Sequence, residues 1–181
     1  MSVAETVGGG ETGPGRLGVM GYLADCRACA ENAAAELGDD PWAVARLRTG
    51  VVRLNPTQYH RGATFFVARS CVVELHDLDR ETRALHLEEM AQVAEAVVRW
   101  VRPRKMNYEA LGNSVPHLHW WLTPRHTDDP GPGRPIWEDP AFLRALARDD
   151  GHPSPDGCDR LRRELLTELD AVGATIERGY T

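Results

Sequence analysis

The sequence has no apolar run long enough to cross a membrane. No stretch approaches 18 apolar residues, which is about the shortest length read as a transmembrane helix. The amino-terminal segment MSVAETVGGGETGPGRLG also lacks the basic and then apolar pattern of a secretory signal. These absences predict a soluble, cytoplasmic protein without a membrane partner.

An excess of positive charge is also missing. The chain has 21 basic and 27 acidic residues, for a net charge of −6. Proteins that bind long nucleic acids carry a basic surface, so we expect no such partner, and a polyanionic ligand would need a local positive site. With 181 residues, 42% of them hydrophobic, the chain is large enough for one domain with a real core.

Cysteines are few, and their spacing favours metal or thiol chemistry over disulfides. Cys26 and Cys29 form a C-x-x-C pair, which can be a redox pair, a chance pair on a helix or half of a zinc site. A thioredoxin-like motif would need a preceding buried strand, which this segment lacks.

Periodicity and turn signals predict an α+β fold. The expected elements are a mobile tail over 1–18, a helix within 22–38 ended by Gly38, strands at 51–54 and 63–69, a helix from the Asp79 cap to Val101, strands at 105–111 and 115–123, and a final helix marked by Leu161, Leu165, Leu169, Val172 and Ile176. Leu87, Met90, Ala94, Val97 and Val101 are predicted to form the buried stripe of the long helix. This order suggests an antiparallel sheet with helices packed on one face.

Candidate chemistry lies in GNSVPHLHWWLTPR, residues 112–125. On a strand, His117, His119 and Trp121 share one face, with the two imidazoles about 7 Å apart. A neutral imidazole can attack phosphorus, and the backbone of the turn before the strand, with Ser114, can hold phosphate oxygens. A pair of structural histidines is the alternative that H-x-H alone favours.

A longer stretch decides between these readings. NYEALGNSVPHLHWWLTPRHTDDP, followed by RPIWEDP, resembles the bacterial branch of the histidine-triad (HIT) superfamily. The resemblance implies a HIT-like domain over 19–140, a carboxy-terminal helical extension over 141–181, and a homodimer that joins two sheets. It also implies an enzyme, a hydrolase or nucleotidyltransferase, that attacks a nucleoside phosphate conjugate such as a dinucleoside polyphosphate through a nucleotidyl-histidine at His119.

The resemblance also assigns roles to individual residues. Besides His119, we expect catalytic roles for Ser114 and Asn107, and substrate contacts from Asn55, Gln58, Asn113, Trp121 and Arg125. Arg125 can equally pair with Asp128 or Asp129. Trp120 and Trp137 are expected to pack in the core or an interface, and His60, His76 and His86 to lie at the surface.

Trp121 departs from the family pattern, which usually has a histidine there. An indole offers one N–H and cannot carry a proton to a leaving group, so hydrolase activity is in doubt. The alternatives are a zinc-stabilised nucleotide-binding protein with little turnover, or a repurposed enzyme of a biosynthetic pathway with a non-nucleotide substrate.

Zinc-bearing members of this superfamily complete the metal site with a later histidine and the first histidine of the triad. The resemblance therefore implies a structural zinc held by Cys26, Cys29, Cys71 and His117, with Cys71 at the position of the usual histidine. Thiolate is an equally good zinc ligand. Buried free thiols are the alternative, His76 or His60 is the reserve ligand, and Cys158 has no place in the set.

Overall fold

The computed structural model describes residues 25–130, 133–148 and 151–180. The predicted tail over 1–18, the start of the 22–38 segment and part of the loop between Pro130 and Pro135 lie outside the described residues. Within the described residues, no helix is both long and apolar enough to span a membrane.

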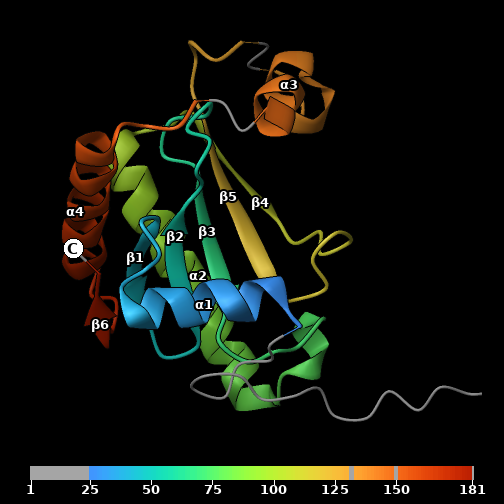
Figure 1. Ribbon diagram of the computed structural model, residues 1–181, viewed down its shortest axis with the longest axis vertical. Helices are drawn as coiled ribbons and strands as arrows, with labels where there is room; N and C mark the ends of the chain where they lie inside the picture. Colours follow the sequence, from blue (N-terminus) through green and yellow to red (C-terminus); the bar gives the residue numbers. More distant parts are fainter. Residues whose placement is uncertain (1–24, 131–132, 149–150, 181) are drawn as a thin grey trace, which may run out of the picture.

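The described chain forms an antiparallel sheet with helices against it (Figure 1). In chain order the elements are α1 (Arg27–Leu37), β1 (Ala43–Arg46), β2 (Gly50–Leu54), β3 (Thr64–Ala68), η2 (Leu75–Asp77), α2 (Arg80–Val101), β4 (Lys105–Glu109), β5 (His119–Arg125), η3 (Ile136–Glu138), α3 (Pro140–Arg148), α4 (Pro155–Ala171) and β6 (Arg178–Gly179). The strand order is β4-β5-β3-β2-β1-β6. The predicted α+β class and the pairing of β2 with β3 are confirmed.

Helices lie on both faces of this sheet, and not on one face as the order of elements suggested. The long helix α2 packs on one face beside α4, and α1 crosses the other face (Figure 1). The main core lies under α2, where Phe66 and Leu122 of the sheet meet Val93 and Val97. The candidate site lies on the opposite face of the sheet, under α1.

Helix α2 begins as its sequence predicts. The Asp79 carboxylate accepts hydrogen bonds from the backbone N–H groups of Glu81 and Thr82, both 3.0 Å, as an N-cap does. The predicted stripe is only partly right, because Leu87 is 37% exposed whereas His86 and Glu89 are buried.

Glu89 and His86 are buried because they bind the turn between β1 and β2. The Glu89 carboxylate accepts from the backbone N–H groups of Arg48 and Thr49, both 2.9 Å. His86 lies 3.0 Å from the Thr49 hydroxyl and accepts from the Trp120 indole at 3.1 Å. These hydrogen bonds compensate the cost of burying polar groups. They explain why His86 and Glu89, and not Leu87, lie on the buried face of α2.

Other boundaries differ from the prediction. The strand predicted from Val115 begins at His119, so His117 lies in the preceding loop and not on the strand. Two strands were not predicted: β1, and the two-residue β6 that pairs with it. Helix α4 ends at Ala171, before Val172 and Ile176.

The carboxy-terminal segment packs onto the same sheet. Helix α4 contacts α2 and β1, and the Tyr180 hydroxyl donates to Glu36 of α1 at 3.0 Å. The division into a HIT-like domain over 19–140 and an extension over 141–181 stays a prediction.

Candidate functional site

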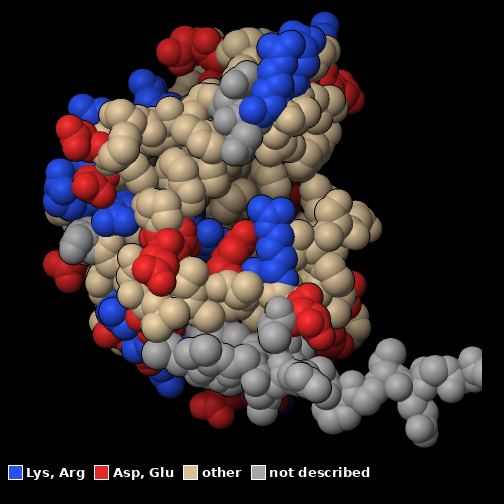
Figure 2. Space-filling model, in the orientation of Figure 1, with Lys and Arg blue, Asp and Glu red and all other residues tan. Residues whose placement is uncertain are grey.

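A cavity of about 490 Å³ opens on the face of the sheet that carries α1. The surface is hollowed between α1 and α3, where charged side chains meet uncharged ones (Figure 2). The cavity is lined by Arg27, Ala28, Glu31, Arg53, Asn55, Pro56, Thr57, Phe65, Val67, Ser114, Val115, His119, Trp121, Trp137 and Leu146. Its size lies within the usual range for small-molecule sites.

His119 stands at the start of β5, half-buried in this cavity. Its Nδ1 lies 2.7 Å from the main-chain oxygen of His117. A carbonyl oxygen can only accept, so Nδ1 carries the hydrogen. In the neutral ring Nε2 then keeps its lone pair, as a nucleophile requires.

An aromatic wall adjoins His119. Trp121 shares its face of β5 and contacts two other rings edge to face, Phe65 at 4.7 Å and Trp137 at 5.4 Å between centroids. The Trp137 indole donates to the Glu109 carboxylate at 3.0 Å. Trp137 comes from η3, so residues beyond the histidine strand help to form the cavity.

A charged wall also lines the cavity. Arg53 pairs with buried Asp40 at 2.7 Å and with Glu31, and Arg27 pairs with Glu31 at 2.9 Å. Burial raises the pKa of Glu31, but the charge of Arg53 and hydrogen bonds from Arg27 and Arg53 outweigh it and leave that pKa below its usual value. Glu31 is therefore an anionic acceptor between two guanidinium groups.

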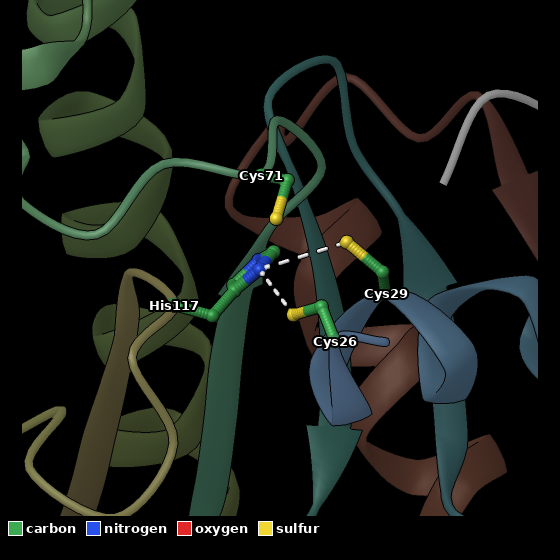
Figure 3. A group of neighbouring side chains, drawn as sticks. All are labelled: Cys26, Cys29, Cys71 and His117. Atoms are coloured by element: carbon green, nitrogen blue, oxygen red, sulfur yellow. Dashed lines mark hydrogen bonds between the residues drawn. The ribbon is translucent and has the colours of Figure 1, made fainter. Parts of the chain in front are cut away.

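The metal ligands predicted from the sequence converge beside the cavity (Figure 3). Cys26 and Cys29 come from the start of α1, Cys71 from the loop after β3, and His117 from the loop before β5. Their four ligand atoms all lie within 4.8 Å of one another. Tetrahedral zinc with three sulfur ligands and one nitrogen ligand needs separations of roughly 3.5–4 Å, so the group fits a structural zinc ion after small adjustments.

The ring of His117 is oriented for such a role. Its Nε2 lies 2.7 Å from the carbonyl oxygen of Ala68, so Nε2 carries the hydrogen and Nδ1 is left to coordinate. Nδ1 points to the sulfurs of Cys26 and Cys29, at 3.4 and 3.8 Å. Such a hydrogen bond on the far nitrogen is typical of metal-ligating histidines.

The Cys71 thiol resists ionisation in the absence of a cation. Burial raises the pKa of Cys71 to about 12, with further contributions from hydrogen bonds and charge interactions with Cys29 and Cys26. A divalent ion reverses this effect, because a coordinating thiol loses its proton. The donor set therefore suits a cation.

The structure brings some of the predicted substrate residues to the cavity and not others. Ser114, Asn55 and Trp121 line it together with His119. Asn113, in the exposed loop before β5, and Asn107, on β4 opposite Thr123, are not among the residues that line it.

Gln58 and Arg125 are engaged elsewhere. The Gln58 amide donates to the carbonyls of Asn55 and Ala63 and accepts from the Gly62 N–H. Arg125 is 5% exposed and pairs with Asp129 at 3.0 Å, so of the two roles expected for it, the structure shows the ion pair.

The surface positions expected for His60 and His86 are wrong, because both are buried, at 1% and 0% exposure. His76 is exposed as expected.

Cys158 is buried and donates from Sγ to the Pro41 carbonyl at 3.1 Å, which is a structural role. Trp120 is half-buried against the core as expected, whereas Trp137 both packs and lines the cavity.

The charged wall and Leu146 were not predicted from the sequence to belong to the site. Arg53 gave a signal, because an arginine interrupts the apolar run of β2. Arg27 and Glu31 gave a weaker one, being spaced four apart beside the C-x-x-C pair. Leu146 gave none, because its role depends on where α3 lies.

Residues 51–128 match the family model of the HIT domain. No curated protein matches the chain. Among solved structures, a histidine triad protein from Marinobacter aquaeolei VT8 aligns with 23% identity and a TM-score of 0.61, covering 72% of this chain and 90% of that one. A hypothetical histidine triad nucleotide-binding protein from Sulfolobus tokodaii strain7 aligns with 13% identity and a TM-score of 0.60, covering 80% and 93%.

A Zn-bound histidine triad family protein from Mycobacterium smegmatis is also similar, with 21% identity, a TM-score of 0.54 and coverage of 81% and 96%. At these identities the likeness concerns the fold. The chain therefore shares the fold of these histidine triad proteins, and its residues 51–128 match the HIT domain.

Proposed function

We propose that this protein is a HIT-like enzyme that acts on a nucleoside phosphate conjugate, such as a dinucleoside polyphosphate, through a nucleotidyl-histidine at His119. The observation that carries the proposal is the hydrogen bond from His119 Nδ1 to the His117 carbonyl, 2.7 Å long. It leaves the lone pair of Nε2 for attack, in a cavity of about 490 Å³.

The reaction has two steps. The Nε2 lone pair forms a bond to phosphorus while the bond to the leaving group breaks, and that electron pair departs with the leaving group. Water, or another acceptor, then attacks phosphorus, the N–P electron pair returns to Nε2, and the proton of the acceptor passes to solvent. Ser114 lines the cavity beside His119 and can donate to a phosphate oxygen.

We also propose that a zinc ion occupies the Cys26, Cys29, Cys71 and His117 group, as a structural ion. The similar protein from M. smegmatis is described as Zn-bound, which supports the proposal. The residues of this chain would then join the start of α1 to the two loops that flank the cavity, so that the loop before β5 is held in place.

A nucleotide-binding protein with little turnover is the second candidate, and Trp121 is the observation that favours it. Its indole occupies the position two residues after His119, and it cannot shuttle a proton. The similar protein from S. tokodaii is described as nucleotide-binding.

Nucleotide release from diadenosine polyphosphates separates the two candidates. Wild-type protein should release nucleotide, His119→Ala should not, and His76→Ala, which removes an exposed histidine, should match the wild type. Binding without release in all three proteins would favour the second candidate. Neither binding nor release would contradict both.

A homodimer is proposed as well. β4 forms one edge of the sheet and carries the exposed Tyr108, at 49%. Pairing of two β4 edges would join the sheets of two subunits and protect this edge from other partners. Light scattering after size-exclusion chromatography should give twice the chain mass, and Tyr108→Lys should weaken the dimer; a monomeric wild type would contradict the proposal.

A further inference from the structure

The strand position beside the nucleophile is occupied by a fixed aromatic side chain. Trp121 is wedged between Phe65 and Trp137, and Trp137 is held in turn by Glu109. Edge-to-face contacts of this kind stabilise aromatic pairs beyond their buried area. Trp121 is thus set against the cavity, where its indole can donate a hydrogen bond but cannot give up its proton.

The other described residues that line the cavity do not supply an acid either. Besides His119, those with charged side chains are Arg27, Glu31 and Arg53. Guanidinium groups do not lose a proton in proteins, and the Glu31 carboxylate accepts from both arginines. The hydroxyls of Ser114 and Thr57 are weaker acids still.

The same residues can stabilise negative charge. Two guanidinium groups line the cavity, and Arg53 is held in place by Asp40 at 2.7 Å. Fixed donors at a place where charge develops lower the barrier without reorganisation. The described lining residues therefore offer hydrogen-bond donors to an anion but no acid that would protonate one.

We propose that this site acts on nucleotide conjugates whose leaving group departs as a stable anion, namely phosphoanhydrides and aryl esters, and discriminates against phosphoramidates and alkyl esters. The inference depends on the function proposed above and narrows it. When Nε2 of His119 bonds to phosphorus, the electron pair of the broken P–O bond stays on a phosphate or phenolate oxygen, which leaves unprotonated. An amide or alkoxide ion is too basic to leave in this way and needs a proton that the described lining residues do not provide.

The test is a series of compounds that share one nucleoside 5′-phosphoryl group and differ only in the leaving group. The series comprises 4-nitrophenol, phenol, a primary alcohol and a primary amine. For the wild type, kcat/KM should fall steeply along the oxygen leaving groups as their basicity rises, and the phosphoramidate should react poorly. The 4-nitrophenyl ester also reports the first step as a burst of colour.

Two variants test whether Trp121 causes this dependence on the leaving group. Trp121→His restores a proton donor, and it should raise kcat/KM for the alkyl ester by at least about 100-fold, the low end of what a positioned acid contributes. Trp121→Phe keeps an aromatic ring without a donor, so the steep dependence should persist. Melting temperatures show whether both variants are folded. If one is not, the dependence of the wild-type kcat/KM on the leaving group still tests the proposal.

The outcomes separate this inference from the proposed function. A wild type that cleaves the alkyl ester and phosphoramidate as fast as the 4-nitrophenyl ester would overturn the inference and leave the nucleotidyl-histidine mechanism standing. Failure to react with every compound in the series would overturn both.

Discussion

The main-chain carbonyl of His117 accepts a hydrogen bond from Nδ1 of His119, at 2.7 Å. The ring of the same His117 points the other way, with Nδ1 3.4 Å from Sγ of Cys26 and Nε2 2.7 Å from the Ala68 carbonyl. One residue therefore belongs to the metal centre through its side chain and to the nucleophile through its backbone. A ligand that fixes His117 also fixes the acceptor that sets the tautomer of His119.

The protein should contain one zinc ion per chain, and loss of the ion should destabilise it. A metal present at 1,000 times its dissociation constant stabilises the native state by about 4 kcal/mol. For a chain of this size, that corresponds to a fall in melting temperature of roughly 8–16 °C on removal. Elemental analysis gives the metal content, and differential scanning calorimetry with and without a chelator gives the shift.

Two cysteine variants provide the matched comparison for the zinc ion. Cys29→Ser removes a ligand, so both the zinc content and the chelator effect should be lost. Cys158→Ser changes another buried cysteine, outside the metal group, and should retain both. Full zinc content in Cys29→Ser would contradict the proposed ligand set.

Acid should destabilise the fold through His86. Burial lowers the pKa of its imidazole to about 4, whereas the unfolded chain binds this proton near pH 6.5. Because the depressed value belongs to the folded state, the stabilisation is complete above about pH 6.5 and is lost as the pH falls toward 4. Between pH 7.5 and 5 the loss from this group is about 2 kcal/mol.

Urea unfolding at several pH values measures this loss. His86→Gln removes the titrating group and should reduce the dependence on pH, although His60, whose pKa burial also lowers, contributes in the same direction. His76→Gln, at an exposed histidine, should behave as the wild type. An unchanged pH dependence in His86→Gln would show that His86 is not buried in its neutral form.

Helix α3 should contribute to substrate affinity through a single leucine. Leu146 and Leu143 are exposed to similar extents, 38% and 41%, but only Leu146 is among the residues that line the cavity. A partly buried leucine contributes about 1 kcal/mol, so Leu146→Ala should raise KM roughly fivefold, with kcat little changed. Leu143→Ala is the control, and equal KM values for the two variants would contradict a role for α3.

The parts of the fold that could be predicted are those with local signals. The α2 cap at Asp79 and the hairpin of β2 and β3 follow from capping and from runs of β-branched and aromatic residues. The metal ligands were identified because C-x-x-C combined with a resemblance that supplied Cys71 and His117, and these four side chains do converge.

What could not be predicted depends on tertiary contacts. β1 and β6 are short and carry no clear alternation, so only their pairing partners define them. The burial of His86 follows from its bonds to a turn 37 residues earlier in the chain. The charged wall depends on α1 crossing the sheet, which brings Glu31 to Arg53, and sequence spacing does not record such a crossing.

The central claim is that His119 carries the nucleotide covalently, and intact-mass spectrometry tests it most directly. The wild type and His119→Ala are mixed briefly with diadenosine polyphosphate and quenched in conditions that preserve an N–P bond. We expect a mass increase equal to one adenylyl group on the wild type alone, located at His119 by peptide mapping. Nucleotide release with no adduct on the wild type at any time, or an equal adduct on His119→Ala, would contradict the claim.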